Sequence, residues 1–308
     1  MMADEVRIAI TGIGAVHALG TGIEPLVEAL RTGDEPVEDL LEADYDPADF
    51  RESSKTYMDP CSDLALAACY LALRDAGLVP EGAERPELDS DRSGVSLGTA
   101  YGTLESMLNM TGRVQQRGLR LGSPMIFTHA FINTPAALMS IEYDLRGPNM
   151  THSPGDASSA AALGYALTMM RAGRADLMLA GGAEALAEPL IAAMDETGFD
   201  GILAEGAAIL VLETAEHADA RGARPLAELS GAACLAPCQH EAGERALIAA
   251  GIQRARVIDA TSGCGHTFGA SVALSAACCA ALAGEAGEPL AAVSANGSGA
   301  VVIEEWRE

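Results

Sequence analysis

Two cysteines and a histidine form the first group whose types and spacing could support chemistry. Cys234 and Cys238 are separated by three residues and followed by His240, which resembles half of a zinc site. No second pair completes it, because Cys278 and Cys279 are adjacent and lie in an alanine-rich run. We therefore expect no metal, and we interpret the cysteines as small buried hydrophobic residues.

Glycines near the start of the chain raise the possibility of a dinucleotide site. Gly12 and Gly14 follow the strand-like residues Arg7–Thr11, as in a dinucleotide-binding turn. The third glycine arrives only at Gly20, and no helix is expected directly after Gly14. The spacing argues against such a turn, and we expect no cofactor.

Asp156 is a third candidate, in the segment SPGDASSAA at 153–161. It precedes a small-residue helix predicted at 157–172. Aspartate is among the most favourable N-cap residues, because its carboxylate accepts a free backbone N–H and faces the positive end of the helix dipole. An N-cap is the simplest interpretation, and a role as a base or nucleophile is the alternative.

The elements that would position these residues alternate between strand and helix. Residues 13–22 are expected to form a loop. Strands are predicted at 7–11, 93–99, 177–183, 207–213, 225–232 and 256–261, with two more within 291–305, and helices at 23–31, 61–77, 134–143, 157–172, 215–221 and 269–283. This alternation predicts an α/β fold with strands buried on both faces. No low-complexity linker divides the chain.

Composition excludes several classes of partner. The chain has 44 acidic and 19 basic residues, a net charge of -25, and Lys55 is its single lysine. A field of that sign repels phosphates and anionic lipids, so we expect neither nucleic acid nor membrane as a partner. The uncharged stretches Leu121–Ile141 and Thr267–Gly284 are interpreted as buried core rather than as membrane spans. Seven cysteines, an odd number, argue against a disulfide framework, and we expect a cytoplasmic location.

Longer stretches of the sequence resemble a known family. The stretches are RIAITGIGAVHALGTGIEPLVEALRTG at 7–33, SLGTAYGTLES at 96–106, SPMIFTHAFINTPAALMSIEYDLRGPN at 123–149, RAGRADLMLAGGAEA at 171–185, ILAEGAAILVLETAEHADARGAR at 202–224 and, more weakly, SGCGHTFGA at 262–270. Together they resemble a β-ketoacyl synthase of the thiolase superfamily. The resemblance implies a thiolase-like fold of duplicated halves in α-β-α-β-α layers, with a half at 1–190 and a shortened half at 191–308.

The catalytic residues of that family are largely missing from this chain. Asp156 stands where the resemblance places the nucleophilic cysteine, and a carboxylate cannot form the stable thioester that chain transfer requires. The motif of the first catalytic histidine has no counterpart between Gly231 and Arg256. His266 matches the second histidine, but Thr261 replaces the accompanying lysine. We interpret His266 as a hydrogen-bonded remnant, with a catalytic role as the alternative.

Family members that lose the nucleophile but keep the fold are known as chain length factors. The resemblance implies pairing with an active ketosynthase (KSα) in a heterodimer and a contribution to the acyl-chain pocket. The residues placed at that pocket and interface are Tyr101, Met125, Ile126, Phe127, Ala130, Phe131 and Asn133. The loop of Asn296, Gly297, Ser298 and Gly299 resembles the family's gating loop, without its phenylalanine.

The net charge bears on the carrier protein that delivers acyl groups. Acyl carrier proteins of this family are acidic, so a chain of net charge -25 is expected to meet the carrier only indirectly, through its partner. The chain also looks like the short, degenerate partners in polyene-making type II polyketide synthases, such as those of the aryl polyene type. Two other hypotheses remain open: a decarboxylase-like enzyme using Asp156 and His266, and a homodimeric scaffold without a pocket role.

Overall fold

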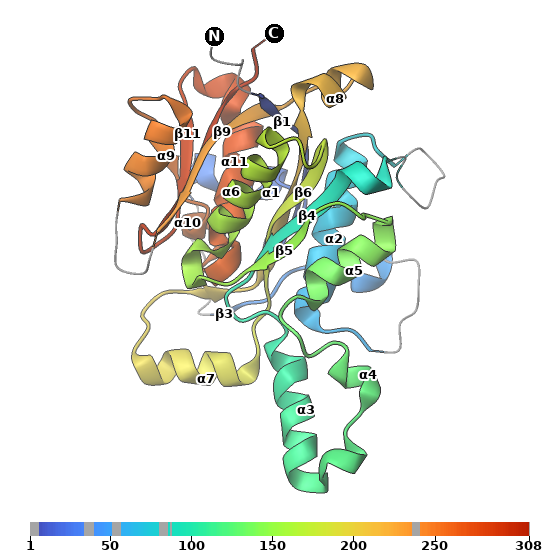
Figure 1. Cartoon of the computed structure of the whole chain (residues 1–308). Coiled ribbons are helices and arrows are strands. Elements are labelled where there is room, and N and C mark those ends of the chain that lie inside the picture. Colours follow the sequence, from blue (N-terminus) through green and yellow to red (C-terminus); the bar gives the residue numbers. More distant parts are fainter. Residues whose placement is uncertain are drawn as a thin grey trace.

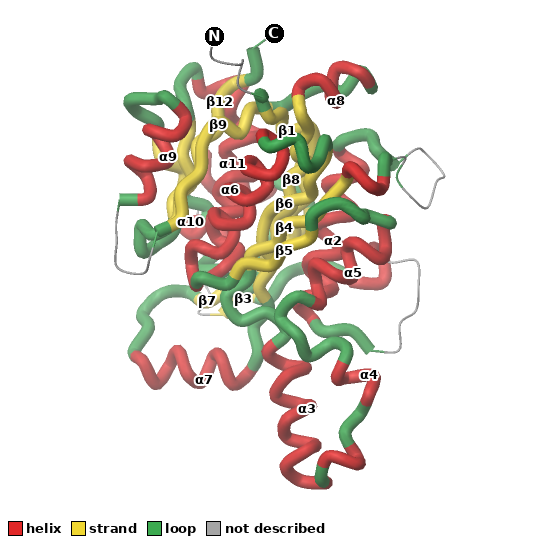
Figure 2. The backbone as a smooth tube through the Cα atoms, in the orientation of Figure 1, coloured by secondary structure: helices red, strands yellow, loops and turns green. Residues whose placement is uncertain are grey.

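A computed structural model describes residues 6–33, 40–50, 57–79, 86, 88–235 and 241–307. Its main sheet has ten strands in the order β10-β11-β12-β9-β1-β8-β6-β4-β5, with β2 paired to β1. Figure 2 shows that the strands run as two layers on either side of two helices. The layers join at one edge, where β1 and β9 pair at only two positions.

The first layer contains β1 (Ile8–His17), β8 (Gly206–Thr214), β6 (Leu177–Glu184), β4 (Ser93–Gly98) and β5 (Asn149–His152). The second layer contains β9 (Ala227–Cys234), β12 (Gly299–Glu305), β11 (Leu290–Val293) and β10 (Arg256–Ile258). The short strand β2 (Gly20–Thr21) extends the first layer, and β3 (Leu40–Leu41) pairs separately with β7 (Leu203–Ala204).

Helices complete five layers (Figure 1). The central helices are α6 (Ser158–Arg171) and α11 (Ser271–Ala286), and α1 (Glu24–Thr32) and α10 (Thr261–Cys264) flank them. The outer helices are α2 (Pro60–Asp75) and α5 (Thr134–Tyr143) on the first layer and α9 (Ala242–Ala250) on the second. The remaining helices are α3 (Leu104–Arg117), α4 (Pro124–Phe127), α7 (Glu188–Thr197) and α8 (Ala215–Ala220), with 3₁₀ turns η1 (Pro47–Phe50), η2 (Ser90–Arg92), η3 (Leu119–Leu121), η4 (Gly155–Ala157) and η5 (Phe268–Ala270).

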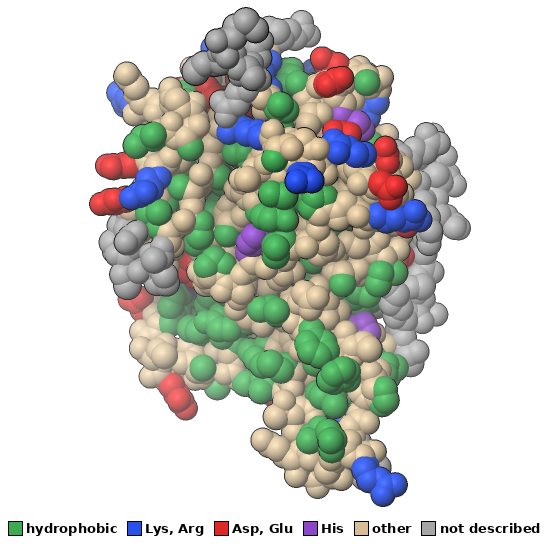
Figure 3. Space-filling model, in the orientation of Figure 1, with side chains coloured by type: hydrophobic (Ala, Val, Ile, Leu, Met, Phe, Trp, Pro, Cys, Tyr) green, Lys and Arg blue, Asp and Glu red, His purple; other side chains and the backbone are tan. Residues whose placement is uncertain are grey.

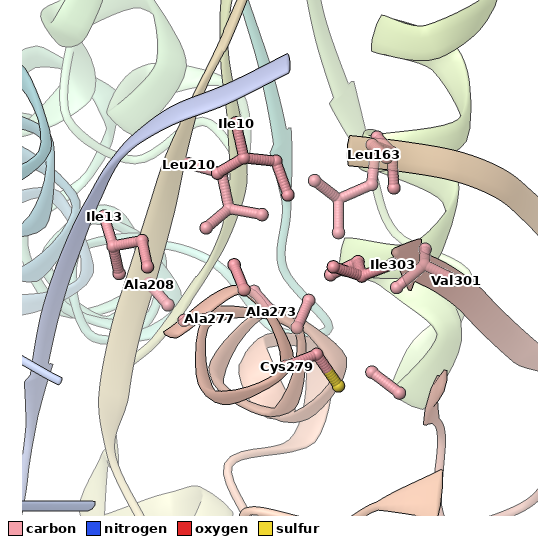
Figure 4. Packing of buried hydrophobic residues seen from close by; sticks show 14 of the residues in the cluster. Ile10, Ile13, Leu163, Ala208, Leu210, Ala273, Ala277, Cys279, Val301 and Ile303 are labelled. Carbon is pink, nitrogen blue, oxygen red and sulfur yellow. The ribbon is translucent and has the colours of Figure 1, made fainter. Parts of the chain in front are cut away.

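The largest core lies between the two strand layers. Figure 4 shows Ile10 and Leu210 of the first layer facing Ile303 of the second across the central helices. Alanines dominate the facing surfaces of α6 and α11, including Ala160, Ala166, Ala273 and Ala277. Small side chains let helices and sheets approach closely while still excluding water, which explains how a chain with 4% aromatic residues builds a core. The α-β-α-β-α arrangement implied by the resemblance is confirmed.

The prediction of a loop at 13–22 is wrong over its first half, because β1 continues to His17. The glycines that interrupt the apolar pattern are packing residues. A Cβ at Gly12 would lie 2.5 Å from the Ala72 carbonyl oxygen, and one at Gly14 would overlap the Ala68 carbonyl oxygen. Glycine at both positions lets α2 pack directly on the strand, so these residues form no nucleotide turn.

The division expected at residue 190 does not coincide with a boundary between layers. Strand β8 belongs to residues 191–308 by sequence, yet it lies between β1 and β6 of the first layer. The reason is the antiparallel pairing of β8 with both neighbours, which places Gly206–Thr214 in the centre of that sheet.

The two uncharged stretches behave differently. One helical segment of the described residues, Phe268–Ala286, is long and apolar enough to cross a membrane, but 83% of its apolar window is buried in the protein. The other stretch lies only partly in the core: Ala136, Leu138 and Met139 of α5 are buried there. Its remaining large apolar side chains are mostly more than 40% exposed, namely Met125, Phe127, Phe131, Ile132 and Ile141. Much of it belongs to a projecting arm, residues 104–132, which carries α3 and α4 (Figure 1).

Candidate functional site

The candidate site forms where three neighbouring parallel strands end. β4 pairs in parallel with both β5 and β6, so the residues that follow all three strands meet at one edge of the sheet. Thr99–Gly102 follows β4, Ser153–Asp156 follows β5, and Glu184 ends β6. This edge lies close to the arm and α7 in Figure 1.

Asp156 and His266 come together at this edge. His266 Nε2 lies 3.5 Å from Asp156 Oδ1, and the two side chains are 13% and 24% exposed. The prediction that Asp156 caps the following helix is wrong, because the N-cap of α6 is Ala157 and has no side-chain cap. Asp156 lies within the 3₁₀ turn η4 instead, one residue too early to reach the free N–H groups of α6.

Aromatic rings extend from His266 toward the arm. The His266 and Phe268 ring centroids are 4.7 Å apart, and Phe268 lies 5.3 Å from Tyr101 in an edge-to-face contact. Phe199 packs on the other side, with its ring centroid 5.5 Å from that of His266. We call Tyr101, Phe268, Phe199 and His266 the aromatic wall. Phe268 has a φ of 45°, an unusual conformation for a residue with a side chain.

A buried carboxylate lies behind this wall. Glu184 is fully buried and accepts hydrogen bonds from the backbone N–H groups of Ala100, Tyr101, Gly102 and Gly269. Burial raises the pKa of Glu184 to about 7, while these hydrogen bonds oppose the shift. Partial burial of the Tyr101 side chain raises the pKa of its phenol, and the negative charges of Glu184 and Asp156 raise it further.

The loop of residues 296–299 lies against the turn that carries Asp156. A Cβ at Gly299 would lie 2.8 Å from the side chains of Ala157 and Ala160. Asn296 Oδ1 accepts from the Ser298 backbone N–H and hydroxyl and from the Ser294 hydroxyl, which closes the loop into a compact turn. The loop therefore packs against Ala157, the residue that follows Asp156.

Thr261, which stands in place of the lysine, supplies no positive charge. Its hydroxyl and backbone N–H both donate to Asp259 Oδ1, at 2.7 and 3.0 Å. The polar contact of the His266 ring is therefore with Asp156, and its backbone N–H and C=O pair with Ile202 and Ala204. This geometry fits the interpretation of His266 as a residue held in place by the fold.

The predicted pocket residues of the arm divide by exposure. Met125, Phe127 and Phe131 are 47–50% exposed, and the rings of Phe127 and Phe131 meet edge-to-face at 4.9 Å. Ile126 is buried and faces inward. Ala130 is half-buried, and Asn133 is exposed and precedes α5 without a side-chain cap. Met125, Phe127 and Phe131 belong to a larger group of exposed apolar side chains on the arm, which we call the arm patch (Figure 3). Its other members are Met107, Leu108, Leu119 and Ile132.

Several site residues were missed from the sequence. Glu184, Phe268, Phe199 and Ile132 all contribute, and a pocket of about 460 Å³ beside the wall is lined by Phe199 together with Asp195 and Asp200. Ile132 reaches the turn after β4, because a Cβ at Gly102 would meet its side chain at 2.7 Å. A charged residue ending the apolar strand LMLAGGAE was the available signal for Glu184.

Among the described residues, the buried cysteines are poor candidates for an alternative nucleophile. Burial raises the pKa of the Cys61 thiol, the one nearest to Thr99, and it raises the pKa of Cys264 to about 12. Cys234 is exposed, contrary to expectation, while Cys238 and His240 lie outside the described residues. Among the residues that the structure describes, no three His, Cys, Asp or Glu side chains gather as a metal site.

Comparison with known proteins identifies the family. The family model "Beta-ketoacyl synthase, N-terminal domain" matches residues 40–218, more than half of the chain. The chain belongs to the β-ketoacyl synthase family. The 3-oxoacyl-[acyl-carrier-protein] synthase 2 of Rhizobium meliloti (strain 1021) is 30% identical over 273 residues, covering 73% of this chain and 63% of that protein. The synthase 2 of Coxiella burnetii (strain RSA 493 / Nine Mile phase I) is 29% identical, covering 73% and 62%.

This β-ketoacyl synthase homologue spans about three fifths of the length of those curated relatives. Solved structures share its fold. The ishigamide ketosynthase/chain length factor superposes with a TM-score of 0.82 at 22% identity, covering 98% of this chain and 100% of that one. A β-ketoacyl synthase from Burkholderia phymatum STM815 gives 0.81 at 25% identity, with the same coverage. The thiolase-like ketosynthase fold is thereby shown.

Proposed function

We propose that this chain is a non-condensing ketosynthase homologue that acts as a chain length factor. It pairs with an active ketosynthase and shapes the pocket for the growing acyl chain, in type II polyketide or fatty-acid-like biosynthesis in the cytoplasm. The observation that carries the proposal is Asp156, which occupies the nucleophile position and contacts His266 at 3.5 Å. A carboxylate at this position is compatible with the fold, but it cannot form the thioester that the condensing reaction requires.

The surface around β5 supports a protein partner. β5 is the last strand of its sheet, so one of its edges has no strand partner within the described ranges. Met150 on β5 is 41% exposed, and Ile141 on the neighbouring helix α5 is 67% exposed. An open strand edge flanked by exposed apolar side chains is suited to pairing with a strand of another subunit. The arm patch continues this apolar surface outward.

The site also fits a pocket wall better than a reaction centre. Tyr101 is 36% exposed, and through Phe268 its ring is continuous with His266. Phe127 and Phe131 supply exposed aromatic surface on the arm. Rigid aromatic rings fix the shape of an apolar cavity, because they have few rotatable bonds and large contact areas. Their placement supports a role in setting how far an acyl chain can extend.

The charge distribution refines the expectation about the carrier protein. Residues 104–121 of the arm contain one acidic residue, Glu105, and the arginines Arg113, Arg117 and Arg120. The solved structure titled "AntDE:AntF (apo): type II PKS acyl-carrier protein in complex with its ketosynthase bound to the hexaketide" shares this fold, with a TM-score of 0.80 at 20% identity. We propose that an acidic carrier docks on the ketosynthase partner and approaches this subunit at the arm, where repulsion is least.

Co-purification tests the pairing. The tagged chain, co-expressed with a cysteine-containing ketosynthase, should purify as a heterodimer. Within that complex, Tyr101→Ala and Phe131→Ala should change product length as measured by mass spectrometry. Ile248→Ala is the matched control, because Ile248 is 77% exposed on α9 at the other outer face. Isolation of the chain as a homodimer beside its ketosynthase would reject the pairing and favour the scaffold hypothesis.

One observation favours a second candidate function. The contact between Asp156 and His266 joins an acid or base to an imidazole at the former active site, as a decarboxylase-like enzyme would need. That hypothesis predicts release of CO₂ from malonyl carrier protein by the isolated chain, and its loss in Asp156→Ala. The assignment to an aryl polyene system is a narrower proposal, which the product of the reconstituted complex would test.

A further inference from the structure

Glu184 stands out among the buried carboxylates because it connects three separate segments. It is the last residue of β6 and is fully buried. Its Oε2 accepts from the Ala100 N–H at 2.6 Å and from the Gly269 N–H at 3.2 Å. Its Oε1 accepts from the Tyr101 N–H at 2.9 Å, the Gly102 N–H at 3.2 Å and the Thr99 hydroxyl at 3.1 Å. One carboxylate thus receives five donors.

These donors belong to the two turns that carry the aromatic wall. Thr99–Gly102 presents Tyr101, and Gly269 directly follows Phe268. Their approach to the carboxylate is tight: a Cβ at Gly269 would overlap the Ala100 nitrogen and lie 2.8 Å from Glu184 Oε2. The wall's central contact, between the Tyr101 and Phe268 rings at 5.3 Å, therefore spans two turns that are bound to the same side chain.

We infer that Glu184 is a positioning residue that fixes the Tyr101 turn against the Phe268–His266 turn, and thereby the shape of the proposed acyl pocket. The inference about pocket shape rests on the proposed function. Glu184 binds the backbone of the two turns and is itself buried. It therefore affects a ligand only through the side chains of Tyr101, Phe268 and His266.

Above its pKa of about 7, Glu184 presents only acceptor oxygens, and every group around it is a donor. Glutamine keeps the shape but replaces one oxygen with an NH₂ group. In one orientation the NH₂ group would face the backbone N–H groups of Ala100 and Gly269. In the other orientation it would face those of Tyr101 and Gly102. A buried donor left without an acceptor is costly, so the turns would move apart to admit water or to find other acceptors.

The test compares Glu184→Gln with Glu213→Gln in the full chain. Glu213 is also fully buried, and it lies at the opposite end of the same pair of strands, where Leu177 pairs with Glu213 and Glu184 pairs with Gly206. It binds Arg221 and His217 and does not touch the wall. Glu213→Gln therefore controls for the general loss of stability that follows removal of a buried carboxylate.

The first readout does not depend on any partner. Ring NMR signals of His266 and Tyr101 in the isolated chain should shift in Glu184→Gln and stay in place in Glu213→Gln, although both variants lower the melting temperature. The second readout is product length in the complex with the ketosynthase, which should change only in Glu184→Gln. If Glu184→Gln does not fold, Gly269→Ala, which forces the same two turns apart, replaces it in both measurements.

The outcomes separate the two claims. Unchanged ring signals in a folded Glu184→Gln variant would overturn the positioning role, leaving Glu184 as a purely structural residue. Shifted ring signals with an unchanged product would support the positioning of the wall and reject its part in the pocket. Failure of the chain to bind the ketosynthase would reject the proposed function, while the NMR result would still decide the positioning of the turns.

Discussion

His266 Nε2 lies 3.5 Å from Asp156 Oδ1, at the point where the family's sequence pattern would place a histidine near a nucleophilic cysteine. The pair joins η4 to the turn that follows α10. Asp156 contacts His266 and does not cap α6, so it contributes little to the stability of that helix.

Asp156→Ala should lower the free energy of unfolding by at most about 1 kcal/mol, since a partly exposed pair contributes little. Asp59→Ala is the matched comparison. Asp59 is 1% exposed, caps α2 through the Cys61 N–H, and accepts from the Ser106 hydroxyl at 2.6 Å. Its loss should cost about 2 kcal/mol or more. Urea unfolding measures both, and equal losses would restore the cap interpretation of Asp156.

Gly14→Ala should destabilise the protein by roughly 2 kcal/mol or more, because the added methyl group would overlap the Ala68 carbonyl in the contact between β1 and α2. Gly112→Ala provides the control. Gly112 lies in α3 with open space around its Cβ position, so the substitution should raise helix stability by up to about 1 kcal/mol. Thermal unfolding of both variants tests this assignment, which a stable Gly14→Ala variant would contradict.

Two buried glutamates should contribute to stability with opposite dependence on pH. Arg221, His217 and Thr11 hold the pKa of Glu213 at about 2 despite its burial, so the stability it contributes is present above its ordinary pKa of 4.5 and is lost as the pH falls toward 2. Burial raises the pKa of Glu184 to about 7, so its contribution is present below 4.5 and is lost as the pH rises through 7. Each carboxyl group thereby changes the free energy of unfolding by about 3 kcal/mol over its pH range.

Melting curves from pH 3 to pH 8 test both signs. Glu213→Gln should flatten the acid side of the stability profile, and Glu184→Gln should flatten the profile between about pH 4.5 and 7. If both variants kept the slope of the wild-type profile, the pKa values of the two carboxyl groups would not be shifted as described.

Thiol alkylation of the native chain should modify Cys234 ahead of the other described cysteines. Cys234 is exposed, whereas Cys61, Cys69, Cys264, Cys278 and Cys279 are buried, and burial raises the pKa of every one of these thiols. Peptide mapping by mass spectrometry after brief treatment with iodoacetamide provides the measurement. Rapid modification of Cys61 or Cys264 would reveal a reactive thiol and reopen the question of a nucleophile.

Much of this architecture was predictable because its signals are local. The helix predicted at 134–143 is α5 to the residue, and the strands ending in Gly98 and Glu184 follow from short apolar runs bounded by glycine. The resemblance to the family predicted from the sequence alone that Asp156 stands at the position of the nucleophile, and no folding can convert that carboxylate into a thiol. Helices α3, α7 and α9 were not predicted, and in α7 and α9 the small or mixed residues show no strong periodicity.

The tertiary structure decided what those residues touch. It joined β8 to the first layer, and it packed Gly12 and Gly14 of β1 against α2. It also brought Asp156 to His266 rather than to the end of α6. It also gathered five donors from distant segments onto Glu184, which no sequence spacing encodes. Composition and local pattern determine which elements form, whereas contacts between distant segments depend on how those elements pack, and the site is made of such contacts.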